Sequence, residues 1–386
     1  MQDFEFYLPT KIIFGRDSLK RFPKEISSLG KKCLFLYGQG SIKRTGLYDR
    51  IVDILKNTSI QFEEFGGIKS NPTLVQVREA IQLARSLKPD FLLAVGGGSV
   101  IDVGKAVACG YYYQGNLWDL FERKLVPDKA LPLAVISTIA GTGSEINNIS
   151  VIVNELKRYK LSLRSPVLFP KFSFIDPSLT LTVPREYVAY GVMDAFSHLF
   201  EFFMFRDLRQ NNVTEDLLVL FMKDLIKWGV RTVEEPTDYY ARSQVHWISL
   251  LALSPLVRAG LGSYRFLLHS LEHPLSGGYP IAHGQGLATL VRAYLRINRA
   301  HEAVRSFFVR VLEVPLGPDL AKRGLKAYDS LLERLSLPKT LREVGLSEDV
   351  IHDLAEKAWE ILHLWKAEKD INRESLVKIY LEAFGH

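Results

Sequence analysis

The stretch FLLAVGGGSVIDVGK, residues 91–105, joins a predicted strand, a glycine turn and a predicted helix. Residues 91–95 form a continuous apolar run, which is typical of a strand buried on both faces. Gly96, Gly97 and Gly98 end this run, and a helix is predicted from Ser99. Glycines let the backbone pass close to a ligand, and the N–H groups of a helix start attract anions. By itself the stretch fits either a tight turn or a pyrophosphate site.

The same order of strand, glycine turn and helix recurs through the first half of the chain. Apolar runs at residues 32–37, 60–65 and 133–137 alternate with helical spacing at residues 47–55 and 73–87. The run at 133–137 ends in a second glycine turn, Ala140-Gly-Thr-Gly-Ser144. Such alternation predicts parallel strands with right-handed crossovers, so we expect a doubly wound, Rossmann-like α/β domain. Both turns are expected at the carboxyl edge of its sheet, where ligands bind.

The pattern changes near Pro184, beyond which strand-like alternation is almost absent. Residues 216–228, 304–312 and 350–364 carry apolar side chains three and four apart, as amphipathic helices do. Thr340-Leu-Arg-Glu343 has the form of a capping box, and Ser347 with two following acids predicts another helix start. We therefore predict an α/β domain over residues 1–184 and an all-helical domain over residues 185–386.

Composition restricts the class of protein. The chain has 386 residues, of which 47% are apolar and 24% charged, as in ordinary globular proteins. Its net charge of +6 is spread through mixed-sign runs, so nucleic acid is not an expected partner. No run approaches the ~20 apolar residues of a membrane span, and no signal peptide is visible. Two cysteines indicate a reducing compartment, so we expect a cytoplasmic protein without a membrane partner.

Histidines and one carboxylate recur at metal-ligand spacing in the second half. Asp194 and His198 are four residues apart, which on a helix places them on one face. His269 and His273 repeat this spacing, and His283 stands among glycines. Imidazoles with one carboxylate suit Fe²⁺ or Zn²⁺, whereas a Cys-rich structural zinc site is excluded. Spacing alone does not decide which of His269 and His273 binds the metal.

At these motifs the sequence resembles the iron-containing (group III) alcohol dehydrogenases, most closely their butanol-dehydrogenase-like branch. The resemblance runs essentially end to end and includes the motifs at residues 96–105, 140–145, 191–198 and 269–284. It implies a dinucleotide-binding α/β domain, a helical metal-binding domain of dehydroquinate-synthase-like fold, and a homodimer. The implied activity is hydride transfer between NADP(H) and a small alcohol or aldehyde, with Fe²⁺ or Zn²⁺ as a second cofactor.

The resemblance also implies roles for individual residues. The metal ligands it implies are Asp194, His198, His269 and His283, and His273 is the implied catalytic histidine beside the nicotinamide. The positions implied to bind the cofactor are Gly97, Gly98, Ser99, Asp102, Thr138, Thr142, Lys160 and Leu179. The usual Pro-Thr-Thr before Ala140 is replaced by Ser137-Thr138-Ile139, which removes one hydroxyl from this region.

The turn after the first predicted strand bears on the choice of cofactor. NAD-preferring members of the family commonly carry an Asp there, but this chain has Gly38-Gln-Gly40-Ser41. Without that carboxylate a 2′-phosphate is not repelled, and Ser41 with the Gly40 and Ser41 amides can donate to it. We therefore predict NADP rather than NAD, with NAD as the alternative.

Two other reactions compete with this interpretation. A zinc-dependent glycerol or polyol dehydrogenase is the closer alternative. The intact pair of Asp194 and His198 argues against a dehydroquinate-synthase-type lyase, which would also be expected to have a polybasic phosphate-substrate site. No such site is evident in the sequence. A nucleotide-sensing protein without catalysis would be expected to have lost ligands, but all four are present.

Overall fold

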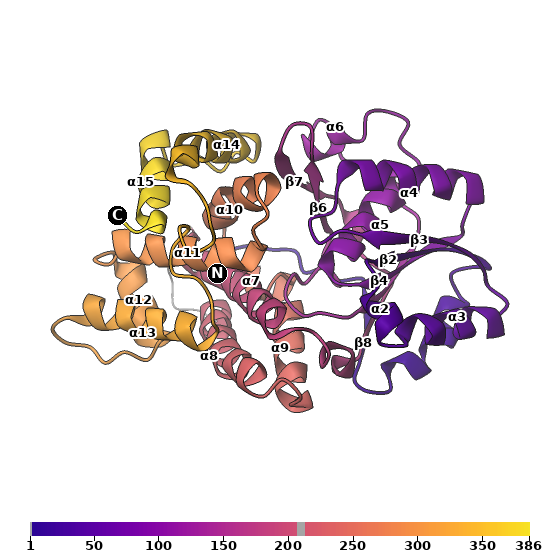
Figure 1. Ribbon diagram of the computed structural model, residues 1–386, viewed down its shortest axis with the longest axis horizontal. Helices are drawn as coiled ribbons and strands as arrows, with labels where there is room; N and C mark the ends of the chain where they lie inside the picture. Colours follow the sequence, from indigo (N-terminus) through magenta and orange to yellow (C-terminus); the bar gives the residue numbers. More distant parts are fainter. Residues whose placement is uncertain (1, 207–212) are drawn as a thin grey trace. The chain divides into compact units, whose positions relative to one another are not determined.

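The computed structural model describes residues 2–206 and 213–386 and divides into two compact units (Figure 1). One unit spans Tyr7–Thr182, and the other spans Val183–His386 together with the few residues that precede Tyr7. The first is built on a parallel sheet and the second on helices. The predicted fold class, α/β followed by all-α, is confirmed.

A six-stranded parallel sheet, in the order β1-β8-β5-β4-β2-β3, forms the centre of the α/β unit. Its strands are β1 (Lys11–Phe14), β2 (Lys32–Gly38), β3 (Gln61–Ile68), β4 (Phe91–Gly96), β5 (Leu133–Ser137) and β8 (Phe172–Ile175). Strand β4 pairs on both sides and is buried along its whole length, as its unbroken apolar run predicts.

Helices cover both faces of this sheet, with α4 and α5 on one side and α2 and α3 on the other (Figure 1). The helices of this unit are α1 (Phe22–Ile26), α2 (Ser41–Arg44), α3 (Leu47–Asn57), α4 (Leu74–Leu87), α5 (Gly98–Gly110) and α6 (Trp118–Phe121). Alternate strand residues face opposite ways, so Phe35 and Leu93 join the core formed with Ile51 of α3. On the other face, Gly104 of α5 lies close to Ala94 and Leu133.

The direction in which the chain adds strands to the sheet changes at β2. The chain first adds β3 on one side of β2 and then crosses over to add β4 on the other side. In open α/β sheets this switch point, at the carboxyl ends of the strands, is where ligands bind. The turn after β2 contains Gly38–Ser41, and the turn after β4 contains Gly97 and begins α5. Both glycine turns therefore flank the switch point.

A two-stranded antiparallel hairpin, β6 (Ile149–Asn154) and β7 (Tyr159–Arg164), lies outside the main sheet. A buried lysine connects it to α5: Lys105 Nζ donates to Ser144 Oγ, Asn147 Oδ1 and the Ile149 carbonyl, each at 2.8 Å. Ser144 Oγ in turn donates to Asp102 Oδ1 at 2.6 Å. Burial lowers the pKa of Lys105 and raises the pKa of Asp102. The start of α5, the turn after β5 and the hairpin are thus fixed to one another through a buried cation.

The second unit consists of helices among its described residues. They are α7 (Arg185–Met204), α8 (Val213–Glu234), α9 (Tyr239–Leu251), α10 (Leu267–Gly278), α11 (His283–Ile297), α12 (Glu302–Arg310), α13 (Leu320–Arg334), α14 (Ile351–Leu364) and α15 (Arg373–Phe384). The long helix α7 is buried along most of its length and packs against α8, α10 and α11. In the described part of the chain, no helix has the length and apolarity needed to cross a membrane.

The predicted helix start at Thr340 is wrong. Only half of the capping box is formed, since Glu343 N donates to Thr340 Oγ1 at 3.3 Å. The Glu343 side chain accepts from Thr340 Oγ1 at 3.1 Å and from the Lys339 amide at 3.0 Å, not from the Thr340 amide. However, residues 341–345 form only a turn. The capping motif satisfies local donors, but no apolar stripe follows it to bury a helix face. The second predicted start is found, because Ser347 precedes a short 3₁₀ turn that leads into α14.

Replacing Lys105 with methionine should destabilise the α/β unit by about 3–5 kcal/mol, because the change leaves the carboxylate of Asp102 buried without its nearby cation. Thermal unfolding followed by circular dichroism measures the loss. The exposed Lys129→Met is the control and should unfold as the wild type does. A Lys105→Met protein as stable as this control would contradict the structural role given to the buried ammonium.

Candidate metal centre

Asp194 and His198 lie on α7, one turn apart and facing the same way, as their spacing predicts. Both side chains are buried, with 8% of each exposed, and His198 Nε2 is 3.6 Å from Asp194 Oδ1. Burying a carboxylate in an apolar core is costly unless positive charge or hydrogen bonds compensate it. Their position inside the helical unit therefore needs a physical reason.

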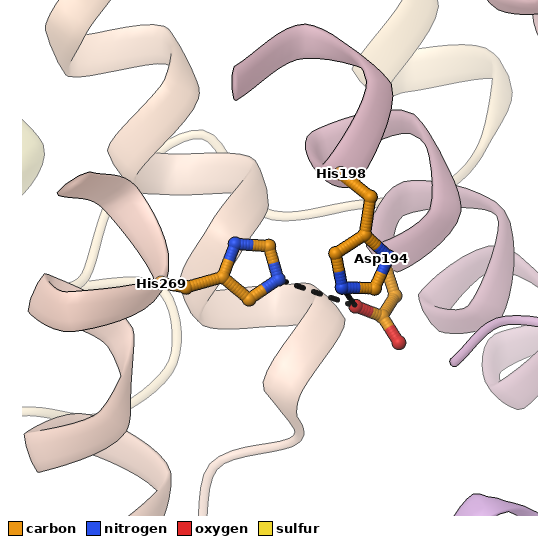
Figure 2. A group of neighbouring side chains, drawn as sticks. All are labelled: Asp194, His198 and His269. Carbon is orange, nitrogen blue, oxygen red and sulfur yellow. Dashed lines mark ion pairs between the residues drawn. The ribbon is translucent and has the colours of Figure 1, made fainter. Parts of the chain in front are cut away.

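His269 of α10 reaches the same point from a facing helix (Figure 2). Its Nε2 is 3.6 Å from Asp194 Oδ1, and its ring lies parallel to that of His198 with centroids 4.5 Å apart. One donor atom from each of Asp194, His198 and His269 lies within 4.8 Å of the others. These three residues form the one buried group of potential metal donors in the described part of the chain.

His283 supplies a fourth donor from the first residue of α11. Its Nε2 is also 3.6 Å from Asp194 Oδ1. A glycine permits this approach: a Cβ on Gly284 would lie 2.4 Å from the backbone oxygen and 2.5 Å from the Cα of Tyr190 on α7. The start of α11 can therefore rest directly against the α7 backbone, which brings the neighbouring His283 to the cluster.

The donor atoms fit a metal ion better than they fit one another. Three imidazole nitrogens surround Asp194 Oδ1 at 3.6 Å, which is too long for hydrogen bonds. Neither Asp194 Oδ1 nor His269 Nε2 has a hydrogen-bond partner among the described residues, although both are buried. Donor atoms around a tetrahedral ion with ~2.1 Å bonds lie ~3.4 Å apart, close to the spacing found here.

Carboxylates and imidazoles shift one another's pKa values at this point. Burial alone would lower the pKa of His269, but the charges of Glu201 and Asp194 raise it to about 9. Burial lowers the pKa of His198 to about 3, which keeps that imidazole neutral and able to act as a ligand. Although burial opposes it, the neighbouring histidines hold the pKa of Asp194 well below its usual range. An ionised carboxylate beside a neutral imidazole is a donor set that can bind a metal cation.

His273 lies one turn beyond His269 on α10 and is also buried. Its ring stands edge-on to Trp365 at 5.3 Å between centroids and lies 6.0 Å from the ring of His283. It is not one of the three histidines whose nitrogens lie 3.6 Å from Asp194 Oδ1. Of the two histidines between which the spacing could not decide, the structure brings His269 to the cluster.

Two buried glutamates, Glu201 and Glu272, also contact histidines of this cluster and were not predicted from the sequence. Glu201 on α7 contacts Nδ1 of His269, and Glu272 on α10 contacts Nδ1 of His283. Both glutamate side chains are fully buried. The available signal was an acid inside an otherwise apolar helical run, as in FSHLFEFFMF at residues 196–205.

The residues predicted to bind the cofactor lie mostly along one edge of the parallel sheet. Gly38, Gly40 and Ser41 follow β2, Gly97, Gly98 and Ser99 follow β4, Thr138 and Thr142 follow β5, and Leu179 follows β8. The two inner turns are in contact, because a Cβ on Gly98 would lie 2.4 Å from Thr142 Oγ1. The N-cap of α5 is Gly97, which has no side chain to cap the helix. The amides of the first turn can therefore donate hydrogen bonds to a bound anion.

Three of the predicted cofactor residues are engaged within the protein. Asp102 is buried, and its carboxylate accepts from Ser144 Oγ and from the Val151 amide at 3.0 Å. The Ser99 hydroxyl donates to the Ser70 carbonyl. Lys160 lies on β7 rather than on the main sheet, and its Nζ is 3.4 Å from Asn71 Oδ1.

Comparisons with known proteins decide the family. Residues 9–177 match the description "Iron-containing alcohol dehydrogenase", and residues 188–384 match "Fe-containing alcohol dehydrogenase family, C-terminal". The chain belongs to the iron-containing alcohol dehydrogenase family. It is therefore an oxidoreductase, and the predicted alcohol dehydrogenase or aldehyde reductase activity is confirmed.

Named relatives place the chain in the predicted butanol-dehydrogenase-like branch. It is 36% identical to NADH-dependent butanol dehydrogenase A of Clostridium acetobutylicum, over 93% of each chain. It is 32% identical to the NADPH-dependent aldehyde reductase YqhD of Escherichia coli, over 93% of this chain and 94% of the other. The crystal structure of an NADH-dependent butanol dehydrogenase A from Thermotoga maritima has a TM-score of 0.94, 35% identity and 99% coverage of both chains.

Replacing Gly284 with alanine should push the start of α11 away from α7 and carry His283 out of reach of Asp194. We expect a loss of ~1–3 kcal/mol in stability from the clash with the Tyr190 backbone. We also expect weaker binding of divalent metal, measured by competition with a chromophoric chelator. Gly278→Ala is the matched control, since its Cβ would meet nothing within 4 Å. Equal metal affinity in the two variants would contradict this role for Gly284.

Proposed function

We propose that this protein interconverts small aldehydes and alcohols with NADP(H) and a divalent metal, Fe²⁺ or Zn²⁺, held by Asp194, His198, His269 and His283. The observation that supports it most directly is the convergence of three histidine nitrogens on Asp194 Oδ1, each at 3.6 Å. The named relatives act on butanol or on aldehydes, which suggests uncharged substrates of similar size.

Fe²⁺ is the metal we propose first, because three imidazoles and one carboxylate suit it and because the family is named for iron. Zn²⁺ accepts the same donors and is the alternative. A bound divalent ion acts as a Lewis acid, which polarises a carbonyl oxygen or lowers the pKa of an alcohol. The four residues position that charge in a buried site, where it acts most strongly on a substrate oxygen.

The α/β unit is proposed to bind the dinucleotide, whose nicotinamide carries the hydride. Gly97, Gly98 and the amide of Ser99 are proposed to hold the pyrophosphate at the start of α5. Thr138, Thr142 and Leu179 extend the same sheet edge and are proposed to line the rest of the cofactor. Asp102 and Lys160 are also proposed to contribute to the cofactor site, and each has a hydrogen-bond partner within the protein.

NADP is the preferred dinucleotide in this proposal, with NAD as the alternative. The turn after β2 carries no carboxylate from Gly38 to Arg44, and Lys43 and Arg44 follow the exposed Ser41. The nearby acid Glu64 accepts from the hydroxyls of Tyr37 and Tyr48. Names among the relatives include both NADH and NADPH dependence, so preference must be measured.

The variant Ser41→Asp should reverse the cofactor preference. A carboxylate at this turn would repel a 2′-phosphate and accept hydrogen bonds from a ribose, so kcat/KM for NADPH should fall ~10–100-fold relative to NADH. The neutral, equally sized Ser41→Asn is the control and should keep the wild-type preference. A wild-type protein that prefers NADH would contradict the NADP preference inferred from this turn.

His273 is proposed to relay the proton between the substrate oxygen and solvent. It is buried beside His283 and against Trp365, which places an imidazole next to the donor set without making it a ligand. An imidazole can accept a proton at one ring nitrogen and donate one from the other, which suits this task.

Turnover of a simple carbonyl tests the function. We expect anaerobically purified, metal-loaded protein to oxidise NADPH with butanal and to reduce NADP with butanol. Glycerol distinguishes the polyol dehydrogenase, which would favour it over butanol. No turnover with any of these substrates at full metal occupancy would overturn the proposal.

Two histidine variants separate the proposed ligand from the proposed relay. His269→Ala should lose both metal and activity, whereas His273→Ala should keep its metal and lose ~10²–10⁴-fold in rate. Metal content is measured by elemental analysis and rate by NADPH oxidation. The exposed His352→Ala is the control and should match the wild type. If His273→Ala loses metal and His269→Ala keeps it, the two roles must be exchanged.

We further propose that residues 1–184 and 185–386 are the two functional domains, which the division between Thr182 and Val183 supports. A homodimer is proposed as the assembly. In the described chain β1 pairs only with β8, and the nearby Tyr7 and Phe14 are exposed, so the edge can accept another chain. A cytoplasmic location is proposed from the two free cysteines, both buried.

A further inference from the structure

Two glutamates are fully buried in the helical unit, Glu201 on α7 and Glu272 on α10. Neither belongs to the proposed ligand set, which is formed by Asp194 and the three histidines whose nitrogens lie 3.6 Å from its Oδ1. A carboxylate with no exposed surface destabilises the fold unless a specific set of hydrogen bonds or charges compensates it. What these two side chains contact therefore indicates why they are there.

Each glutamate contacts the outer ring nitrogen of one proposed ligand. Glu201 Oε2 meets His269 Nδ1, and Glu272 Oε2 meets His283 Nδ1. A carboxylate accepts, so Nδ1 of each ring carries a proton, which leaves Nε2 as the nitrogen whose lone pair can bind a metal. In both rings that Nε2 is the atom 3.6 Å from Asp194 Oδ1.

The glutamates are themselves held in place. Glu201 Oε1 accepts from the Leu268 amide, at the start of α10 and next to His269. Glu272 Oε2 also accepts from Ser276 Oγ at 3.0 Å, one turn along the same helix. Because their oxygens are fixed from a second direction, these carboxylates can set the plane of each imidazole as well as its tautomer.

The contacts run from one helix to the next. Helix α7 carries Asp194 and His198 together with Glu201, which contacts the histidine of α10. Helix α10 carries Glu272 three residues after that histidine, and Glu272 contacts His283 of α11. Each of the first two helices thus supplies donors of its own and orients the donor of the next.

We propose that Glu201 and Glu272 are positioning residues of the metal centre, which fix the tautomer and orientation of His269 and His283 and thereby determine how tightly the site holds its ion. This inference rests on the proposed metal site. His198 differs from the other two ligands, because its Nδ1 is buried and has no hydrogen-bond partner among the described residues. The centre therefore has two oriented imidazoles and one held by packing alone.

Metal affinity of purified apoprotein tests this without reliance on turnover. Zn²⁺ is titrated against a chromophoric chelator, and Co²⁺ is added separately so that its visible absorption reports the coordination geometry. Glu201→Gln and Glu272→Gln keep an oxygen that can accept from Nδ1 but remove the charge. Each should weaken Zn²⁺ binding ~10–100-fold. The isosteric control is Glu215→Gln, a buried glutamate of the same unit that pairs with Arg206 and Arg310.

Leucine variants add a ranking that a purely structural role would not produce. Glu201→Leu and Glu272→Leu remove the acceptor as well, so folded protein should bind Zn²⁺ more weakly than the Gln variants and alter the Co²⁺ spectrum. Circular dichroism identifies variants that fail to fold. If a Leu variant does not fold, the Zn²⁺ affinity of the corresponding Gln variant decides the test. Loss of thermal stability with unchanged affinity in the folded Gln variants would overturn the inference.

Asp194→Asn and His269→Ala distinguish this failure from failure of the proposed metal site. If both lose Zn²⁺ while Glu201→Gln and Glu272→Gln bind it as the wild type does, only the positioning role is wrong. If the wild type binds no ion, or if Asp194→Asn and His269→Ala bind as well as the wild type, the proposed site itself is wrong and the positioning role falls with it.

Discussion

Negative charge buried in an apolar core is the constraint on which the helical unit depends. Asp194, Glu201 and Glu272 lie among helices whose other inward side chains are largely aromatic and aliphatic. Such carboxylates are tolerated only where donors or cations surround them. Helices α7, α10 and α11 meet that requirement by bringing three imidazoles to one point, and Gly284 lets the last of these helices come close enough. The contacts that pack α7, α10 and α11 together are therefore the same contacts that assemble the candidate metal centre.

Local spacing was sufficient to predict part of this centre. Asp194 and His198 share a helix face by geometry alone, so their pairing follows from the sequence. His269 and His273 also share a face, and the choice between them depends on where α10 lies against α7, which no local pattern encodes. Glu201 and Glu272 were missed for a related reason. Each is three residues from a proposed ligand on its own helix but contacts the proposed ligand of another helix.

In the α/β unit, unbroken apolar runs ending in glycine predicted β2, β4 and β5 and the turns that follow them. The strand order β1-β8-β5-β4-β2-β3 could not be predicted in this way, because β1 pairs with β8, which lies near the other end of the unit in sequence. The hairpin that carries Lys160 likewise depends on distant partners such as Lys105. At Thr340 the opposite error arose, because a local capping contact formed without the long-range burial that a helix needs.

The two cysteines of the chain have a practical consequence for spectroscopy. Cys33 and Cys109 are both buried, and burial raises the pKa of each thiol, that of Cys109 to about 12. Thiolate is the reactive form, so neither side chain should compete for a thiol-directed dye in the folded protein. A single cysteine introduced at any exposed position of the described chain would then be labelled selectively. Fluorescent or spin probes could be attached to either unit with the native cysteines left in place.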